Sequence, residues 1–317
     1  MEARLLSDPP RPSADPPRVE LAGLGVLEGE YAVGGPSAVA QFLAIPFAAP
    51  VDGPCRWAPP RPPVPWAPAV RRNPFELPRC PQPRTASSRT FHAHRVVDDE
   101  SACLNLNVFI PLAADRSAAD DSLALLPIVF YIHGGAGKLG SAHEGFDSLS
   151  APTLAAGQRV VVVTTQYRLG ALGFLAHPEL AAEDEERAAD GGEGWSAARG
   201  ARERGVAGVA GCGNYAVLDL LAALRWVQAH AAAFRGDASN VTIFGLSTGA
   251  QVSPQRFWLL LSASERCLWV LLGVFGSFCA LLSASGRFWL LLSASARFCG
   301  RFVAPECLFG LSRVHSS

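Results

Sequence analysis

The stretch VTIFGLSTG at residues 241–249 decides the fold of this chain. The apolar run VTIF at 241–244 predicts a buried strand, and Gly245 and Gly249 flank Ser247 in the pattern G-x-S-x-G. A turn of this kind joins a strand to a helix and projects its serine hydroxyl, while the glycines remove side chains that would collide in the bend. The stretch therefore predicts a strand, a tight turn and a helix, with Ser247 as the candidate nucleophile.

Two further apolar runs precede this turn, LPIVFYI at 126–132 and RVVVVTT at 159–165. Both are unbroken and rich in β-forming residues, as is typical of strands that are buried on both faces of a mostly parallel sheet. Residues 215–234 then carry apolar side chains at three- and four-residue steps, which predicts a helix with one buried face. Residues 25–115 are dense in proline and fit short antiparallel strands and ordered loops.

Composition limits the function classes. The chain has 317 residues, 49% of them apolar, which is enough for one large α/β domain or two smaller ones. A formal charge of −1 argues against nucleic acid as a partner. The 8 cysteines form no C-x-x-C pair, so no metal site is predicted. The first 20 residues hold no apolar signal-peptide core as written, and their prolines predict a disordered leader over 1–20.

The turn His133-Gly134-Gly135-Ala136-Gly137 follows the first buried run. Backbone N–H groups of such a turn, with the N–H of the residue after the nucleophile, Thr248, would hold the negative charge that develops on an ester oxygen. His133 itself is expected to support the turn and not to act as a base.

Taken together and in this order, the motifs resemble the type-B carboxylesterase family, which includes the cholinesterases. The resemblance runs from about Gly23 to Gln251, within a domain that we place at 21–253. Its motifs are FLAIPFAAP at 42–50, RWAPP at 56–60, CPQ at 80–82, ESACLNLNVFIP at 100–111, the HGG turn, VVVVTTQYRLGALGFL at 160–175, GNYAVLDLLAALRWV at 213–227, FRGDASNVTIFG at 234–245 and the serine turn.

The resemblance implies an α/β-hydrolase fold, a small-molecule carboxylic ester as substrate, an acyl-enzyme mechanism and no cofactor. It makes Ser247 the nucleophile and assigns the oxyanion N–H groups to Gly135, Ala136 and Thr248. Cys80 and Cys103 match the first disulfide of the family. The alternative is that both are buried free thiols, which the lack of a signal sequence favours. The disulfide and the free thiols both stay open.

The chain also departs from the family. The usual G-E-S-A-G turn has Leu246 and Thr248 in place of the acid and the alanine. In this fold the catalytic acid and histidine follow the nucleophile in the chain. After Ser247 the only acidic residues are Glu265 and Glu306, and the only histidine is His315. Ser247, Glu306 and His315 have the right order but no supporting motif. We therefore expect the triad acid and histidine to be missing and this chain to be inactive.

The last part of the chain, 254–317, is unlike the body. RFWLLLSAS occurs at 256–264 and again at 287–295, and this pattern has neither a helical nor a strand period. We interpret 254–317 as an apolar tail that is non-native or, less favoured, membrane-associated, and 183–211 as a low-complexity insertion. We expect the tail to make few specific contacts with the Ser247 site and to have either no defined structure or isolated helices. A transmembrane helix over 267–285 is the less favoured alternative. The fold would then be incomplete, the N-terminal half of the sheet, with strand 241–244 at an unpaired edge.

Three functional hypotheses follow from the sequence. The first is a truncated serine carboxylesterase, and the second is a cholinesterase-like binding or adhesion module without catalysis, in which Leu246 would be at home. The third is a gene-model fragment with no function of its own. The ester substrate, the cellular location and the oligomeric state stay open.

Overall fold

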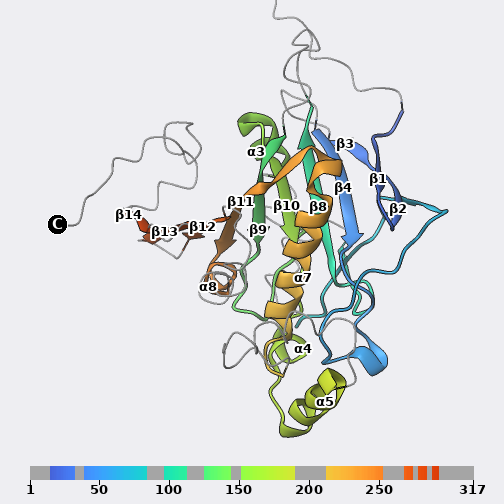
Figure 1. Cartoon of the computed structure of the whole chain (residues 1–317), viewed down its shortest axis with the longest axis vertical. Helices are drawn as coiled ribbons and strands as arrows, with labels where there is room; N and C mark the ends of the chain where they lie inside the picture. The colour runs from blue at the N-terminus through green and yellow to red at the C-terminus, as the bar shows by residue number, and fades with distance from the viewer. Residues whose placement is uncertain are drawn as a thin grey trace, which may run out of the picture.

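The computed structural model describes residues 15–32, 39–83, 96–112, 125–143, 151–189, 212–252, 268–273, 278–283 and 288–292. Its main feature is a nine-stranded sheet (Figure 1). In order across the sheet the strands are β14 (Phe288–Leu292), β13 (Phe278–Ser283), β12 (Leu268–Gly273), β11 (Gly236–Leu246), β9 (Leu126–Ile132), β10 (Val161–Thr165), β8 (Asn105–Pro111), β4 (Val39–Pro46) and β3 (Glu30–Ala32).

The three predicted apolar strands form the parallel centre of this sheet. β9 lies between β10 and β11, and Ile128 pairs with Val161 on one side and Val241 on the other. β9 has the predicted bounds, whereas β10 begins two residues late because Arg159 has a φ of 51° and belongs to a turn. β11 is longer than predicted and begins at Gly236. Beyond β10 the pairing becomes antiparallel, through β8 and β4 to β3.

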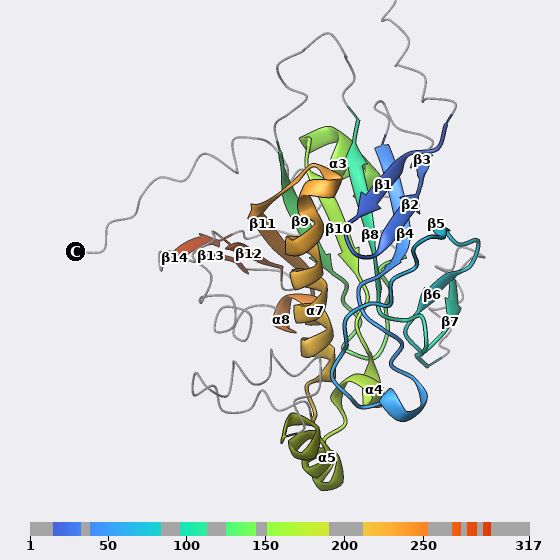
Figure 2. The same ribbon diagram turned by 45° about the vertical axis from the view of Figure 1, so that its right-hand side comes forward.

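Helices cover both faces of the sheet, which explains why its central strands are apolar without alternation. The long helix α7 (Tyr215–His230) lies in front of the sheet in Figures 1 and 2, and Val161 belongs to the core beneath it. On the other face Val162 packs with Ala155 of α3 (Ala151–Gln158). Successive residues of one strand thus reach two separate cores.

The predicted helix 215–234 is confirmed, although its last turn, η2 (Ala231–Phe234), is a 3-10 helix. Among the described residues, Tyr215–Phe234 is one segment whose length and mean hydropathy of 1.2 would allow it to cross a membrane. Most of it, 61%, is buried inside the fold. Burial against the sheet accounts for its apolar face without a bilayer.

Short strands dominate the N-terminal third, as predicted for 25–115. β1 (Arg18–Leu21), β2 (Gly25–Glu28) and β5 (Val70–Arg72) form one small sheet, and β6 (Leu77–Arg79) pairs with β7 (Val96–Asp98). The expectation of antiparallel pairing is wrong for β2 with β5 and for β6 with β7, which are parallel. A further short 3-10 helix, η1 (Gly53–Cys55), follows β4.

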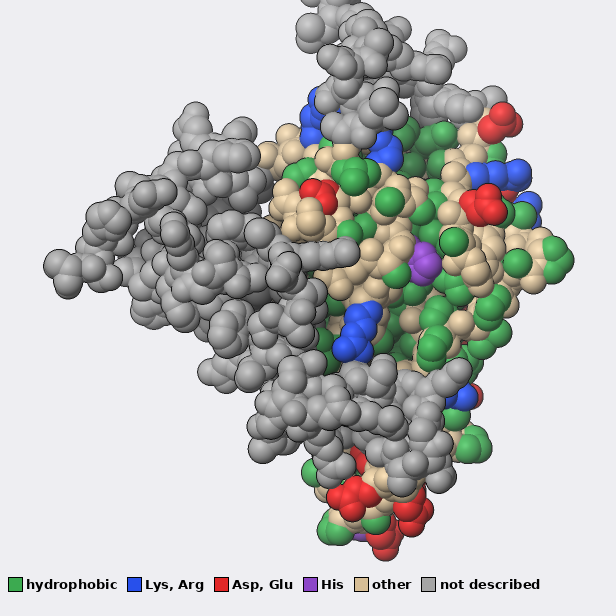
Figure 3. Space-filling view, in the orientation of Figure 1, with side chains coloured by type: hydrophobic (Ala, Val, Ile, Leu, Met, Phe, Trp, Pro, Cys, Tyr) green, Lys and Arg blue, Asp and Glu red, His purple; other side chains and the backbone are tan. Residues whose placement is uncertain are grey.

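The ends of the predicted leader and insertion overlap described elements. β1 begins at Arg18, so the end of the predicted leader 1–20 is a strand, and residues 1–14 lie outside the described ranges. After α4 (Gly170–Phe174), helix α5 (Pro178–Ala189) includes the first residues of the predicted insertion 183–211. Residues 190–211 lie outside the described ranges. The acidic side chains at the lower end of Figure 3 gather where α5 lies in Figure 1.

Of the two alternatives for the tail, isolated helices are not what its described residues form, and the other residues of 254–317 lie outside the described ranges. β12 pairs with β11 in parallel from Val241 with Leu268 to Leu246 with Gly273, and β13 and β14 extend the sheet by antiparallel pairing. β11, the strand that leads to Ser247, therefore has a partner on both sides, against the expectation of an unpaired edge. The segment 267–285, considered above as a membrane helix, instead contains two paired strands, with Trp269 opposite Ser283.

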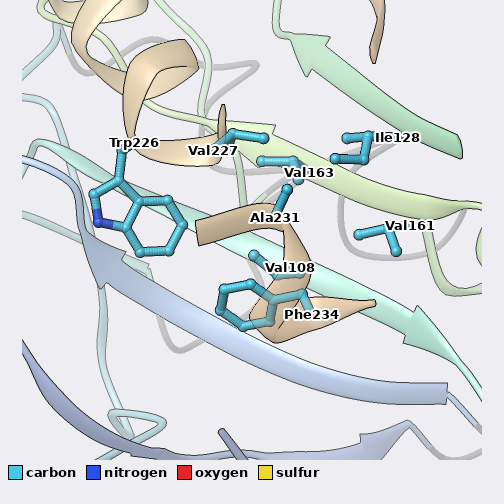
Figure 4. A pocket seen from close by; sticks show the side chains of 8 residues that line it. All are labelled: Val108, Ile128, Val161, Val163, Trp226, Val227, Ala231 and Phe234. Atoms are coloured by element: carbon cyan, nitrogen blue, oxygen red, sulfur yellow. The ribbon is translucent and has the colours of Figure 1, made fainter. Parts of the chain in front are cut away.

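A pocket lies between the sheet and the end of α7 (Figure 4). Its lining is wholly apolar, contributed by Val108, Ile128, Val161, Val163, Trp226, Val227, Ala231 and Phe234. Ile128 and Val161 stand near the starts of strands whose opposite ends lead toward Ser247. This pocket is consequently a packing defect of the core at the end of the sheet remote from the serine turn.

Candidate active site

Ser247 occupies the sharp turn that the sequence predicts. β11 ends at Leu246, helix α8 (Thr248–Val252) begins one residue after the serine, and Ser247 has a φ of 52°. This left-handed conformation is rare for residues other than glycine, and it turns the chain so that the serine is the apex of the bend. The turn is closed by the N–H of Ala250, which donates to the carbonyl oxygen of Ser247 at 3.0 Å.

The two glycines of the turn are required by close backbone contacts. A Cβ on Gly245 would lie 2.5 Å from the carbonyl carbon of Gly249. A Cβ on Gly249 would lie 2.3 Å from the carbonyl oxygen of Ile132, at the end of β9. The first contact lets β11 and α8 meet, and the second seats the start of α8 on the neighbouring strand.

The glycine turn after β9 lies directly against the serine turn. A Cβ on Gly134 would be 2.6 Å from the carbonyl oxygen of Leu246 and 3.2 Å from the Cβ of Ser247. On the other side, a Cβ on Gly137 would be 3.2 Å from the ring of Phe174 and 3.8 Å from Cγ2 of Thr248. The structure thus brings the two motifs together, as their places after neighbouring parallel strands predict.

Backbone donors are available at this junction. Gly135 and Ala136 have φ values of 120° and 57°, so the chain here follows neither a helix nor a strand. Among the hydrogen bonds of the described residues, none uses the N–H of Gly135 or Ala136 as donor. Thr248 is the first residue of α8, so its N–H has no acceptor within the helix. In the described part of the chain, no acceptor is therefore recorded for the N–H groups of Gly135, Ala136 and Thr248.

His133 supports the turn, as expected. Its ring stacks on Tyr167 with 4.4 Å between the ring centres, and its Nδ1 lies 2.8 Å from the carbonyl oxygen of Gly134. The hydroxyl of Tyr167 donates to the carbonyl oxygen of His133 at 2.9 Å. Burial lowers the pKa of His133 to about 4, so the ring is neutral at pH 7. A neutral ring held by these contacts is a structural support.

The partners that would activate Ser247 are not found. In the part of the chain that the structure describes, the Ser247 hydroxyl forms no hydrogen bond with a histidine or carboxylate. The three downstream residues weighed from the sequence, Glu265, Glu306 and His315, all lie outside that part. Within the same ranges no cluster of three or more histidine, cysteine or acidic side chains could hold a metal ion.

Cys80 and Cys103 form a disulfide, which decides between the two readings that the sequence leaves open. Their Cα atoms are 4.6 Å apart and both residues are fully buried. Among the described cysteines, Cys55 and Cys212 are free thiols. The bridge lies close to the site, because Gln82, two residues beyond Cys80, contacts the glycine turn.

Sequence analysis missed this contact of Gln82. Its amide exchanges two hydrogen bonds with the backbone of Gly140, at the end of the glycine turn. The motif CPQ marks the segment, but no local pattern indicates a contact across 58 positions of sequence. Tyr167 lies in one of the family motifs, but the sequence did not predict its contacts with His133.

Comparison with known proteins agrees with this geometry. The profile of the carboxylesterase family matches residues 15–184 and 209–262. The chain is 36% identical to fumonisin B1 esterase of Sphingopyxis macrogoltabida over 236 residues, which cover 74% of this chain and 36% of that protein. It is 34% identical to human cocaine esterase over 245 residues, covering 75% of this chain and 36% of the relative.

A solved structure of a thermophilic PNB esterase superposes with a TM-score of 0.56 at 31% identity, over 74% of this chain and 39% of that one. The architecture is therefore that of an α/β-hydrolase, as predicted, and the match covers its N-terminal part. The chain spans about a third of the length of the curated relatives it matches. With this architecture, these motifs and this profile match, the chain belongs to the carboxylesterase family.

Proposed function

We propose that this chain carries the nucleophile half of a serine carboxylic-ester hydrolase that acts on small-molecule esters. Ser247 would attack the ester carbonyl carbon, and the N–H groups of Gly135, Ala136 and Thr248 would bind the oxyanion that forms. Loss of the alcohol would leave an acyl group on Ser247, which water then removes. The observation that supports the proposal is the close approach of the two turns, since a Cβ on Gly134 would lie 3.2 Å from the Cβ of Ser247.

We further propose that the chain alone turns over esters very slowly. A serine hydroxyl needs a base to accept its proton, and the described residues supply none at Ser247. Leu246, the neighbour that replaces an acid of the family turn, is 47% exposed and apolar and adds no carboxylate. Donors and binding alone leave at most about a thousandfold acceleration over water.

The test is intact-mass measurement of the purified chain after incubation with a fluorophosphonate and, separately, with a p-nitrophenyl ester. The expected result is slow, weak modification that stops at one adduct per chain on Ser247, with no steady-state turnover. Ser247→Ala should remain unmodified. Modification of this variant at the same rate would contradict the role of Ser247, and fast labelling or turnover by the natural chain would contradict the proposed inactivity.

A non-catalytic binding module is the second candidate. It is favoured by the half-exposed Leu246 beside a serine whose hydroxyl has no partner in the described ranges. A fusion of residues 1–252 to the downstream part of human cocaine esterase separates the two. Appearance of ester turnover that Ser247→Ala abolishes supports the hydrolase. A folded fusion that binds esters without turning them over supports the module.

A further inference from the structure

The glycine turn has little hydrogen bonding of its own. Within it, the N–H groups of Lys138 and Leu139 both donate to the carbonyl oxygen of Gly135 at 3.0 Å. The carbonyl oxygen of Gly137 accepts from the N–H of Gly170 at 2.7 Å. Four of its glycine and alanine residues have positive φ: Gly135, Ala136, Gly137 and Gly140. A segment with so irregular a backbone depends on outside contacts to keep one conformation.

Gln82 supplies such a contact at Gly140. Its Nε2 donates to the carbonyl oxygen of Gly140 at 2.8 Å, and its Oε1 accepts from the N–H of Gly140 at 2.9 Å. The same Nε2 lies 3.2 Å from the carbonyl oxygen of Cys80. The side-chain amide thus pairs with Gly140 as a neighbouring strand would, using both backbone groups of that residue.

The contact continues from Gly140 to the serine. Gly140 has a φ of 109°, and a Cβ there would lie 2.4 Å from the carbonyl oxygen of Gly134 and 2.4 Å from Nδ1 of His133. Gly134 in turn touches Leu246 and Ser247. Gly140, Gly134 and the serine turn are thus closely packed one against the next, so we expect a displacement of Gly140 to change the position of Gly134 relative to Ser247.

The other end of Gln82 is fixed. It is two residues from Cys80, whose disulfide partner Cys103 is also fully buried. The backbone N–H of Asn105, just beyond, donates to the carbonyl oxygen of Cys103 at 2.9 Å, and its Nδ2 donates to the carbonyl oxygen of Pro78 at 2.9 Å. The amide of Gln82 therefore connects the turn to a cross-linked part of the core.

We propose that Gln82 is a positioning residue of the oxyanion site, acting through Gly140 to hold Gly135 and Ala136 beside Ser247. This deepens the function proposed above and rests on it. Gln82 itself would not touch the substrate. Two segments would supply the oxyanion donors. Thr248 belongs to helix α8, whereas Gly135 and Ala136 lie in the irregular turn whose end the two hydrogen bonds of Gln82 hold.

The first test is hydrogen–deuterium exchange of the peptide covering 134–139 in the natural chain and in two isosteric variants. Gln82→Met keeps the bulk and removes both hydrogen bonds, and Gln82→Glu places a carboxylate against the carbonyl oxygen of Gly140. Both should exchange faster in this peptide, by about tenfold or more, with exchange in β9 and β10 unchanged. Gln41→Met is the matched control, because its amide bonds Glu30 far along the sheet.

The second test measures phosphonylation of Ser247 over a range of probe concentrations. Gln82→Met should lower the limiting rate by at least about tenfold, short of the hundred- to thousandfold loss for removing a donor outright, with half-saturation unchanged. Unchanged exchange in both Gln82 variants, or equal effects in Gln41→Met, would overturn the proposal. If the natural chain shows no labelling of Ser247, the proposed function fails, while exchange still decides whether Gln82 holds the turn.

Discussion

Arg168 and Asp219 form a fully buried ion pair with two parallel hydrogen bonds, Nε to Oδ2 at 2.8 Å and Nη2 to Oδ1 at 2.7 Å. The backbone N–H of Arg168 also donates to Oδ2 at 3.0 Å. The guanidinium lies over the ring of Tyr215, 5.2 Å from its centre. Because Arg168 follows β10 and Asp219 lies in α7, this pair ties the helix to the sheet edge that carries the site.

Asp219→Ala should lower the free energy of unfolding by about 3–5 kcal/mol, because it leaves the Arg168 guanidinium buried without a counter-charge. Urea denaturation followed by circular dichroism measures the loss. The double variant Arg168→Met/Asp219→Leu removes both charges and should recover most of it. If the double variant is as unstable as Asp219→Ala, loss of the paired charge is not the cause.

Gly249→Ala should lower the free energy of unfolding by about 3 kcal/mol and abolish modification of Ser247. Its Cβ would be 2.3 Å from the carbonyl oxygen of Ile132, which is backbone of the sheet and has no room to move. Gly157→Ala in α3 is the matched control, since a Cβ there meets nothing within 4 Å. Replacing a helical glycine with alanine should stabilise by up to about 1 kcal/mol. Equal melting temperatures for both variants would refute this account.

Reduction of the Cys80–Cys103 disulfide should lower the free energy of unfolding by about 3 kcal/mol, the loop-closure value for a separation of 23 residues. The measurement compares urea midpoints with and without a thiol reductant. A Cys80→Ser/Cys103→Ser variant should lose the part of the response to reductant that this bridge causes, and of the other described cysteines, Cys55 and Cys212 are already thiols. A midpoint of the natural chain that does not respond to reduction would count against a stabilising bridge.

Stability should fall as the pH drops from 7 toward 4. Burial lowers the pKa of His133 and His143 from 6.5 to about 4 in the folded chain. Between these values the unfolded chain binds protons that the folded chain does not, so this contribution is complete above pH 6.5 and declines below it. For each histidine the full contribution is of order 3 kcal/mol.

Urea denaturation at several pH values from 5 to 7 checks this expectation, because few carboxyl groups titrate in that range. His143 is held by Asn107 Nδ2 at 3.2 Å and the carbonyl oxygen of Pro78 at 3.0 Å. Its replacement, His143→Gln, should reduce the slope of unfolding free energy against pH but not abolish it, because burial also lowers the pKa of His133 and His230. An undiminished slope would show that His143 is not one of the groups responsible.

The body of the fold could be predicted because its strands are buried on both faces. Unbroken apolar runs at 126–132 and 159–165 indicate such strands, and the glycine turn that follows the first run marks the end of the sheet at which the candidate site lies. The apolar runs of the tail were not recognised as strands. LWVLLG at 268–273 and FWLLL at 288–292 are also short unbroken runs, and they form β12 and β14. Hydrophobic periodicity alone does not separate a short buried strand from a buried helix.

The site was predictable to the level of its backbone turns. The glycines of G-x-S-x-G and HGG indicate tight turns, and the structure brings Gly134 close to Ser247. What supports these turns was not predictable, because Gln82 and Tyr167 act over 58 and 34 positions of sequence. Such contacts depend on how the core packs, and no short-range pattern records them.

β12 occupies the edge of β11 that β9 does not use, so no other strand can pair there at the same time. A strand has two edges. β11 uses one for β9, from Val241 to Gly245, and the other for β12, from Val241 to Leu246. Whatever chain is to bring further side chains next to Ser247 as a parallel neighbour of β11 must therefore compete with β12 for the same row of N–H and carbonyl groups. The approach of another strand to Ser247 from that side therefore requires that β12 leave β11 first.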